Sequence, residues 1–287
     1  MVNKGKIIFV NGYWNGGPIG SIMKSTEPGK RYWGSKEGGF KEFEKAAERF
    51  FSLYEAPNTH IYLDGSSFMG GDSDGADRFN KGLTDLRVFD DAYFKRYIEN
   101  ADKKGIYSGA NISKIEQHNK NARSIHGNLL EGMDKRKHAF YMVTHSEGGG
   151  YGAGLAKFLI KEGWKVDTVV HLSTDEAEDF DTPPQPMTYQ LGFETGWLKD
   201  YITGNYRIKS GVDKWGIAND SNLTWKSVHG YSKNEEVFPY LEDLRSVVIG
   251  MFMEKGRIIW KQKPESTPNG TKFGSVNGIR LNYIPKH

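Results

Sequence analysis

The sequence contains no cysteine among its 287 residues. This absence excludes disulfide bonds, zinc sites built from thiolates and cysteine nucleophiles. No apolar run approaches the roughly 18 residues that a membrane-spanning helix requires. The first residues show no basic start followed by an apolar core and a small-residue cleavage site, so no signal peptide is visible. We therefore expect either a cytoplasmic protein or one exported by a system that does not use signal peptides.

Charge of either sign is not in excess. Lysine and arginine number 39 and aspartate and glutamate 36, which gives a net charge of +3. This balance, mixed along the chain, makes no case for nucleic acid as a partner. The hydrophobic share of 37% and the charged share of 26% are typical of a globular protein and not of a disordered one. We expect a single domain over residues 1–287.

Short apolar runs alternate along the chain with stretches of helical periodicity. The expected strands are residues 6–10, 59–63, 139–143, 166–172 and 187–193. The expected helices are residues 38–54, 76–104, 112–134, 151–162 and 237–252. We expect loops over 65–75, 173–186 and 194–232 and a β-hairpin within 258–287. The alternation predicts an α/β fold, with a mostly parallel central sheet and helices on both of its faces.

Residues 139–156 contain an apolar strand, a tight turn around Ser146 and a helix that begins with small residues. A nucleophile elbow needs this order, because its serine takes a strained backbone conformation and its neighbours must be small. The start of the helix offers N–H groups and the positive end of a dipole to an oxyanion. Ser146 is therefore the expected nucleophile, and the Glu147 N–H is an expected oxyanion donor.

The segment Thr144-His145-Ser146-Glu147-Gly148 resembles the G-x-S-x-G motif of the α/β-hydrolase superfamily, and of its lipases and esterases in particular. It departs from that motif at Thr144, where the family usually has glycine. The resemblance covers the order of strands and helices over roughly residues 5–250. It implies an α/β-hydrolase fold and a Ser-His-acid triad that cleaves esters through an acyl-enzyme.

The resemblance also implies roles for residues elsewhere in the chain. The family takes a second oxyanion donor from the loop after an early strand, where this sequence has Tyr13 beside Gly12. The family's histidine follows its acid in the chain. His171 lies inside an apolar strand, which is typical of a structural residue. His229 precedes an amphipathic helix and is the expected base.

The acid of the triad stays open at this point. Glu194 directly follows the expected strand 187–193, and Asp175 follows the strand before it. Both places occur in the family, so the two residues are favoured equally. Asp200 and Asp179 remain alternatives.

Cofactor signals are weak in this sequence. An oxygen-rich loop holds several aspartates among glycines and is a candidate for a structural Ca²⁺, but its spacing is not that of an EF-hand, so a plain polar loop is favoured. These residues are Asp64, Asp72, Asp74 and Asp77. His118 and His126 have no third ligand nearby in the sequence, which argues against zinc. No cofactor is expected for the reaction itself.

Residues 64–138 form a long insertion before the elbow and are a candidate cap or lid over the site. Helices that flank the sheet are the alternative. Aromatic side chains in this insertion, such as Phe89 and Tyr93, suggest an apolar acyl-binding cleft. We therefore expect a lipid or ester substrate, with lipase or phospholipase activity and contact with a membrane surface. A small-molecule esterase and a non-catalytic binding module of the same fold are the alternatives.

Within the superfamily, the sequence is most similar to lipase-like proteins of the Bacteroidetes type. Such domains also occur as toxin modules of secreted effectors, including type VI secretion effectors that attack membrane lipids. An effector of this kind would have a cognate immunity protein as a partner.

Overall fold

The computed structural model describes residues 3–12, 32–34, 39–55, 60–65, 74–84, 95–96, 98–100, 103, 129–220, 222–254, 257–264, 275–276 and 279–280. The expected features at Tyr13, Asp72, Phe89, His118 and His126 therefore lie outside the described residues. So does most of the candidate cap.

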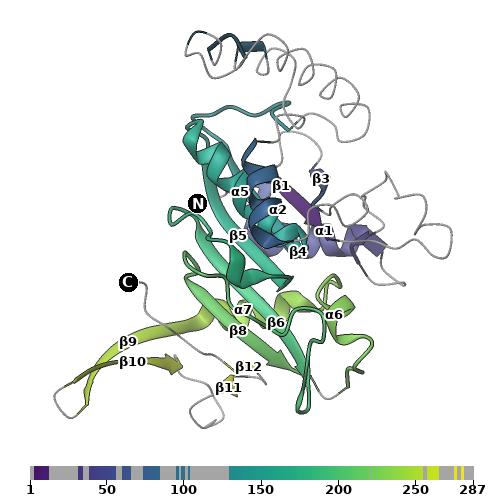
Figure 1. Ribbon diagram of the computed structural model, residues 1–287, viewed down its shortest axis with the longest axis vertical. Helices are drawn as coiled ribbons and strands as arrows, with labels where there is room; N and C mark the ends of the chain where they lie inside the picture. Colours follow the sequence, from purple (N-terminus) through teal and green to yellow (C-terminus); the bar gives the residue numbers. More distant parts are fainter. Residues whose placement is uncertain are drawn as a thin grey trace.

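A mostly parallel sheet forms the centre of the molecule (Figure 1). Its main strands are β1 (Asn3–Asn11), β4 (Ala139–Ser146), β5 (Lys165–Thr174), β6 (Met187–Thr195) and β8 (Lys214–Asn219). They lie in the order β8-β6-β5-β4-β1, and each neighbouring pair is parallel. Two short strands, β2 (Leu53–Glu55) and β3 (Ile61–Asp64), also pair in parallel with β1.

The remaining strands of the described residues pair in antiparallel fashion. β7 (Leu198–Lys199) folds back on β6, and β12 (Ile279–Arg280) pairs with β8. β11 (Ser275–Val276) pairs with β12. β9 (Val247–Glu254) and β10 (Arg257–Pro264) form a separate antiparallel pair.

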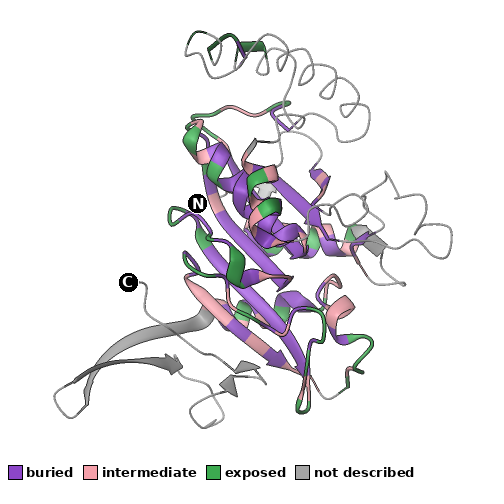
Figure 2. Cartoon of the chain, in the orientation of Figure 1, coloured by how far each residue is buried: buried purple, intermediate pink, exposed green. Residues whose placement is uncertain are grey.

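Helices cover both faces of the sheet, as the alternation of strands and helices predicts. On β4, Tyr141 and Val143 belong to a core shared with α1 (Gly39–Phe50), α6 (Val228–Tyr231) and α7 (Val237–Ser246). Their neighbours Phe140 and Met142 face the other way and pack with α5 (Gly148–Lys161). The central strands are consequently buried between two layers of helices (Figure 2). The α/β class with a mostly parallel sheet is confirmed.

α2 (Gly75–Thr84) belongs to the insertion but packs on the outer side of α5. The two helices touch through glycines: a Cβ on Gly82 would lie 2.0 Å from the Tyr151 carbonyl oxygen, and one on Gly154 would lie 1.9 Å from that of Phe79. This part of the insertion therefore packs on a helix that covers the sheet. The end of the helix expected over 112–134 is absent from residues 129–134, because residues 129–132 form turns and the two that follow have no regular structure. Among the residues with described positions, no helix is long and apolar enough to cross a membrane.

Three other sequence expectations were wrong in part. The expected helix over 38–54 ends at Phe50, because Ser52 takes a φ of +51° and the chain then enters β2. The helix expected over 237–252 ends at Ser246, where the β-branched run Val247-Val248-Ile249 begins β9. The region 194–232, expected to be loops, contains β8.

Candidate active site

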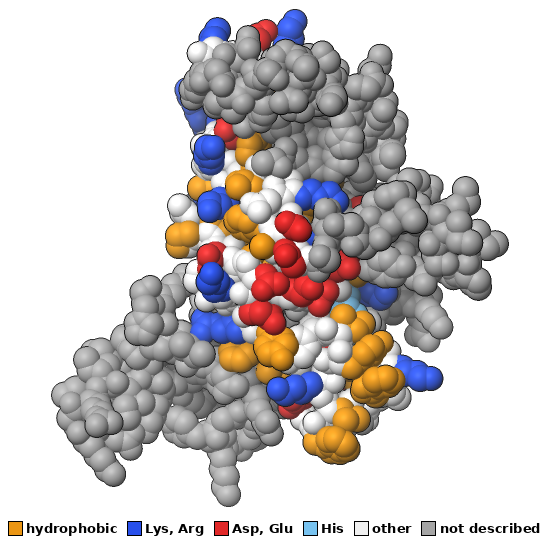
Figure 3. Space-filling model, viewed as in Figure 1, with side chains coloured by type: hydrophobic (Ala, Val, Ile, Leu, Met, Phe, Trp, Pro, Cys, Tyr) orange, Lys and Arg blue, Asp and Glu red, His pale blue; other side chains and the backbone are white. Residues whose placement is uncertain are grey.

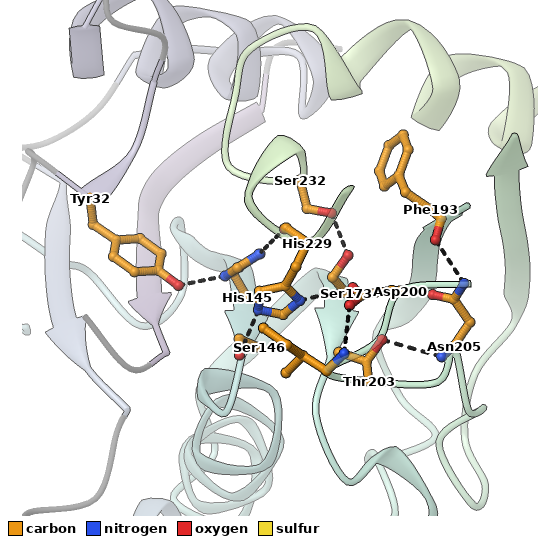
Figure 4. Close-up of polar contacts among 11 residues, drawn as sticks. Tyr32, His145, Ser146, Ser173, Phe193, Asp200, Thr203, Asn205, His229 and Ser232 are labelled. Carbon is orange, nitrogen blue, oxygen red and sulfur yellow. Dashed lines mark hydrogen bonds and ion pairs between the residues drawn. The ribbon is translucent and has the colours of Figure 1, made fainter. Parts of the chain in front are cut away.

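Three residues from distant parts of the sequence meet at the carboxyl edge of the sheet (Figure 4). Ser146 ends β4, Asp200 lies in the loop after β7, and His229 lies in α6. The Ser146 Oγ atom is 3.1 Å from Nε2 of His229, and Nδ1 of the same ring is 2.8 Å from Oδ2 of Asp200. A carboxylate only accepts, so Nδ1 carries the proton and donates it to Asp200. Nε2 is then free to accept from the Ser146 hydroxyl.

The backbone at Ser146 has the strained conformation of an elbow. Its φ is +55°, which is uncommon for a residue other than glycine. The turn is also crowded by the end of β1: a Cβ on Gly12 would lie 2.6 Å from that of Ser146, and one on Gly148 would lie 2.5 Å from the Val10 carbonyl oxygen. Glycine at both positions lets the elbow pass this close to β1.

Thr144 stands where the resemblance leads us to expect glycine, and α5 makes room for it. A Cβ on Gly152 would lie 2.4 Å from Cγ2 of Thr144. The glycine that this contact needs is therefore on the helix, at Gly152, and not on the strand. The Thr144 hydroxyl is 2.8 Å from Nδ1 of His171. Burial lowers the pKa of His171 to about 3, so this histidine is neutral at ordinary pH. His171 therefore lies in the core as a structural residue, as its position in an apolar strand indicated.

The carboxylate at His229 is Asp200, and the preference for Glu194 or Asp175 was wrong. Glu194 is still within β6 and accepts a hydrogen bond of 2.8 Å from Asn219 Nδ2, opposite it on β8. Asp175 faces Arg78, with 3.6 Å between Oδ2 and Nη2. Burial raises the pKa of Asp175, and the nearby Arg78 opposes this effect.

Asp179 lies apart from the imidazole as well. It ends a 3-10 helix, η4 (Ala177–Asp179), and is exposed.

The loop that carries Asp200 is fixed by hydrogen bonds of its own. Oδ1 of Asp200 accepts from the Ile202 N–H at 3.0 Å, and its carbonyl accepts from the Gly204 N–H at 2.8 Å. Asn205, which has a φ of +55°, donates from Nδ2 to the Phe193 carbonyl at 2.8 Å. The side chain of Asp200 is completely buried, so its orientation is set before any substrate binds.

The expected oxyanion donors are described only in part. The Glu147 N–H lies at the beginning of α5, and a Cβ on Gly12 would be 2.9 Å from its nitrogen. The end of β1 thus lies against this donor. Tyr13, the other expected donor, is outside the described residues.

Two residues at the site were missed by sequence reasoning. His145 Nδ1 lies 2.5 Å from the Tyr32 hydroxyl, and His145 Nε2 lies 3.0 Å from the backbone oxygen of His229. The available signal was the position of His145 beside the expected nucleophile, on the strand face opposite Thr144. Nothing in the sequence around Tyr32 indicates that it returns to this place.

No protein-family model and no curated protein matches this sequence. Evidence for a function therefore comes from the geometry of the site.

The part of the chain that the structure describes holds no group of three or more potential metal-binding side chains. Of the aspartates considered for calcium, Asp74 caps α2 by accepting from the Asp77 N–H at 2.7 Å. Asp64 accepts from Asn11 Nδ2 at 3.2 Å. These bonds give both carboxylates a structural role.

Proposed function

We propose that this protein is a serine hydrolase of the α/β-hydrolase fold that cleaves carboxylic esters. The observation that carries the proposal is the continuous series of hydrogen bonds from Ser146 through His229 to Asp200, with the serine at φ +55° between a strand and a helix. A structural serine needs neither the strained backbone nor a buried carboxylate behind the imidazole.

The mechanism follows from these contacts. Nε2 of His229 takes the proton from Ser146 as Oγ attacks the ester carbonyl. The Glu147 N–H, at the positive end of α5, stabilises the negative oxygen that forms. His229 then gives its proton to the departing alcohol. Water, deprotonated by the same ring, cleaves the acyl-enzyme, and the proton returns to Ser146. Asp200 stabilises the imidazolium throughout.

The α/β-hydrolase fold is supported by topology as well as by the elbow. The nucleophile follows a central strand, and the residues occur in the chain order serine, aspartate, histidine, which is the order of that superfamily. The acid and the histidine follow the parallel strands β6 and β8 at one edge of the sheet. This is where open α/β sheets bind their ligands.

The substrate class is supported by exposed apolar side chains in the segments next to Asp200 and His229 in the chain. Trp197 is 88% exposed, Tyr201 52% and Trp225 49%. The rings of Tyr201 and Trp225 pack together with their centroids 4.5 Å apart. On the face that Figure 3 draws, hydrophobic side chains gather beside an acidic patch. Such aromatic surface favours acyl chains, so we propose esters of medium-chain or long-chain acids, lipids included.

The test combines a fluorophosphonate probe with a panel of p-nitrophenyl esters. We expect the probe to label Ser146 and the esters to be hydrolysed. Ser146→Ala should lose both properties, with a loss of about 10⁶ in rate. Ser210→Ala is the matched control, because Ser210 is exposed and bonded to Asp181. A wild-type protein that is neither labelled nor active would instead support a non-catalytic binding module.

A further inference from the structure

His145 connects the nucleophile strand to the catalytic histidine. It precedes Ser146 on β4, is 1% exposed and points to the face of the sheet that α1 and α7 cover. Its ring lies against those of Tyr32 and His229, with centroids 5.5 and 4.8 Å away. The triad does not use this imidazole, yet it touches the histidine that the triad depends on.

The hydrogen bonds of His145 define a single neutral tautomer. The His229 backbone oxygen can only accept, so the bond of 3.0 Å requires a proton on Nε2 of His145. Nδ1 then accepts from the Tyr32 hydroxyl at 2.5 Å. Burial, with His229 nearby, holds the pKa of His145 well below its ordinary value, which keeps the ring neutral.

Tyr32 carries the connection to the other side of the elbow. Its oxygen accepts from the Gly12 N–H at 3.3 Å, and Gly12 is the residue packed against Ser146 and the Glu147 nitrogen. The segment around Tyr32 is also joined to the chain just after α6. The Gly34 N–H donates to the Lys233 carbonyl at 2.7 Å, and Lys233 Nζ lies 4.7 Å from the centre of the Tyr32 ring.

The backbone of His229 needs such a support. α6 has only four residues and its N-cap Ser227 makes no capping hydrogen bond, so little of the helix itself holds the imidazole in place. Val228 is buried in the core, which fixes one side of the turn. The bond from His145 fixes the carbonyl of the catalytic residue itself.

We propose that Tyr32 and His145 are positioning residues, which together form a neutral hydrogen-bonded brace between the backbone of Gly12, just after β1, and the backbone of His229. The brace moves no proton during the reaction. It keeps Nε2 of His229 within reach of Ser146 and holds the end of β1 against the elbow. Its effect on rate rests on the proposed function, whereas its effect on the geometry of His229 does not.

Three variants separate the brace from ordinary core packing. Tyr32→Phe keeps the ring and removes only the hydroxyl. His145→Leu removes both hydrogen bonds. His145→Gln restores a side-chain N–H that can reach the His229 carbonyl. Tyr62→Phe is the matched control, because the Tyr62 hydroxyl bonds to Glu44 outside the site.

We expect kcat to fall about tenfold in Tyr32→Phe and about 10²-fold in His145→Leu, while KM changes less than about twofold, since misplacing a catalytic group affects the reacting state more than binding. His145→Gln should recover most of kcat, and Tyr62→Phe should match the wild type. Wild-type kcat in both Tyr32→Phe and His145→Leu would overturn the brace. If His145→Leu does not fold, as judged by circular dichroism, Tyr32→Phe decides.

Proton NMR tests the same idea without a substrate. The Nδ1 proton between His229 and Asp200 should give a low-field resonance in the wild type and in Tyr62→Phe. We expect it to shift or broaden in Tyr32→Phe and His145→Leu. An unchanged resonance in both would overturn the brace. If the wild type cleaves no ester, the proposed function fails, and this resonance alone decides whether the brace exists.

Discussion

Asp200 lies in a loop and His229 in the short helix α6, in segments that follow different strands, and Oδ2 of the first is 2.8 Å from Nδ1 of the second. The parallel pairing of β6 and β8 explains how they meet. Glu194 lies opposite Asn219 at the ends of these strands, so both segments leave the sheet at the same edge. The Asp220 N–H bonds to the Glu194 carbonyl at 3.0 Å and keeps the two exits together.

Replacing the carboxylate at His229 should distinguish Asp200 from the two acids that the sequence favoured. Asp200→Asn should lower kcat by about 10⁴-fold, because an amide at this position favours the wrong imidazole tautomer. Glu194→Gln and Asp175→Asn, which leave the Asp200 bond in place, should each lower kcat less than about tenfold. The kcat values of the three purified variants are measured by ester hydrolysis and compared with that of the wild type. A larger loss in Glu194→Gln or Asp175→Asn than in Asp200→Asn would assign the acid elsewhere.

The elbow could be predicted because its signal is local. A strand, a serine turn and a helix rich in small residues follow one another between residues 139 and 156, so the chain itself specifies their contact. His229 followed from the order of residues in the resembling family. The compensation of Thr144 by Gly152 was not visible, since it depends on how the helix lies on the strand.

The acid could not be predicted because the path of a loop decides it. β6 continues through Glu194 to Thr195, and a short hairpin with β7 then carries the chain to Asp200. A positive φ angle at Gly196 shapes this path, and the direction in which it turns the chain cannot be predicted from sequence alone. β8 was missed for a related reason: its buried positions are Gly216 and Ala218, which give no apolar alternation.

A second prediction concerns the space between β4 and α5. Gly152→Ala should lower the free energy of unfolding by about 1–3 kcal/mol, because the new Cβ would lie against Cγ2 of Thr144 in a packed core. Thr144→Ser removes that methyl group and keeps the hydroxyl that bonds to His171. The double variant should therefore regain most of the lost stability. Urea unfolding of the wild type, the two single variants and the double variant gives the coupling free energy between the two positions. Additive changes in the free energy of unfolding would show that the two side chains do not share this space.

A third prediction uses the buried His171. Its folded pKa is about 3, below the ordinary value of 6.5, so between these two values the unfolded chain binds a proton that the folded protein does not. The stabilising effect is complete above pH 6.5 and is lost as the pH falls toward 3. Each unit by which the pH falls within this window lowers the free energy of unfolding by about 1.4 kcal/mol.

His171→Gln keeps a polar group beside Thr144 but cannot titrate. Between pH 7 and pH 5 its free energy of unfolding should fall by about 2 kcal/mol less than that of the wild type. Denaturant unfolding at several pH values measures the difference. His145, whose pKa is also lowered by burial, contributes to the fall in both proteins and cancels in the comparison. Parallel stability curves for the two proteins would show that His171 is not buried in the neutral form.

The last prediction concerns the aromatic surface beside the triad. Trp197 lies in the turn before β7 and Trp225 in the turn before α6, close in the chain to Asp200 and His229, and both rings are substantially exposed. If this surface receives acyl chains, Trp197→Ala and Trp225→Ala should lower kcat/KM for long-chain esters and phospholipid vesicles more than for an acetyl ester. Each buried CH₂ group contributes about 0.8 kcal/mol, so a loss of about tenfold requires only two such groups.

Met187→Ala is the matched control for this experiment. Met187 is also exposed, at 44%, but it begins β6 and so lies at the opposite edge of the sheet from the site. Its replacement should leave the chain-length profile unchanged. Equal losses on acetyl and long-chain esters in the tryptophan variants would mean that these rings support the loops and do not bind the acyl chain. The substrate would then be a small ester, and the triad assignment would stand.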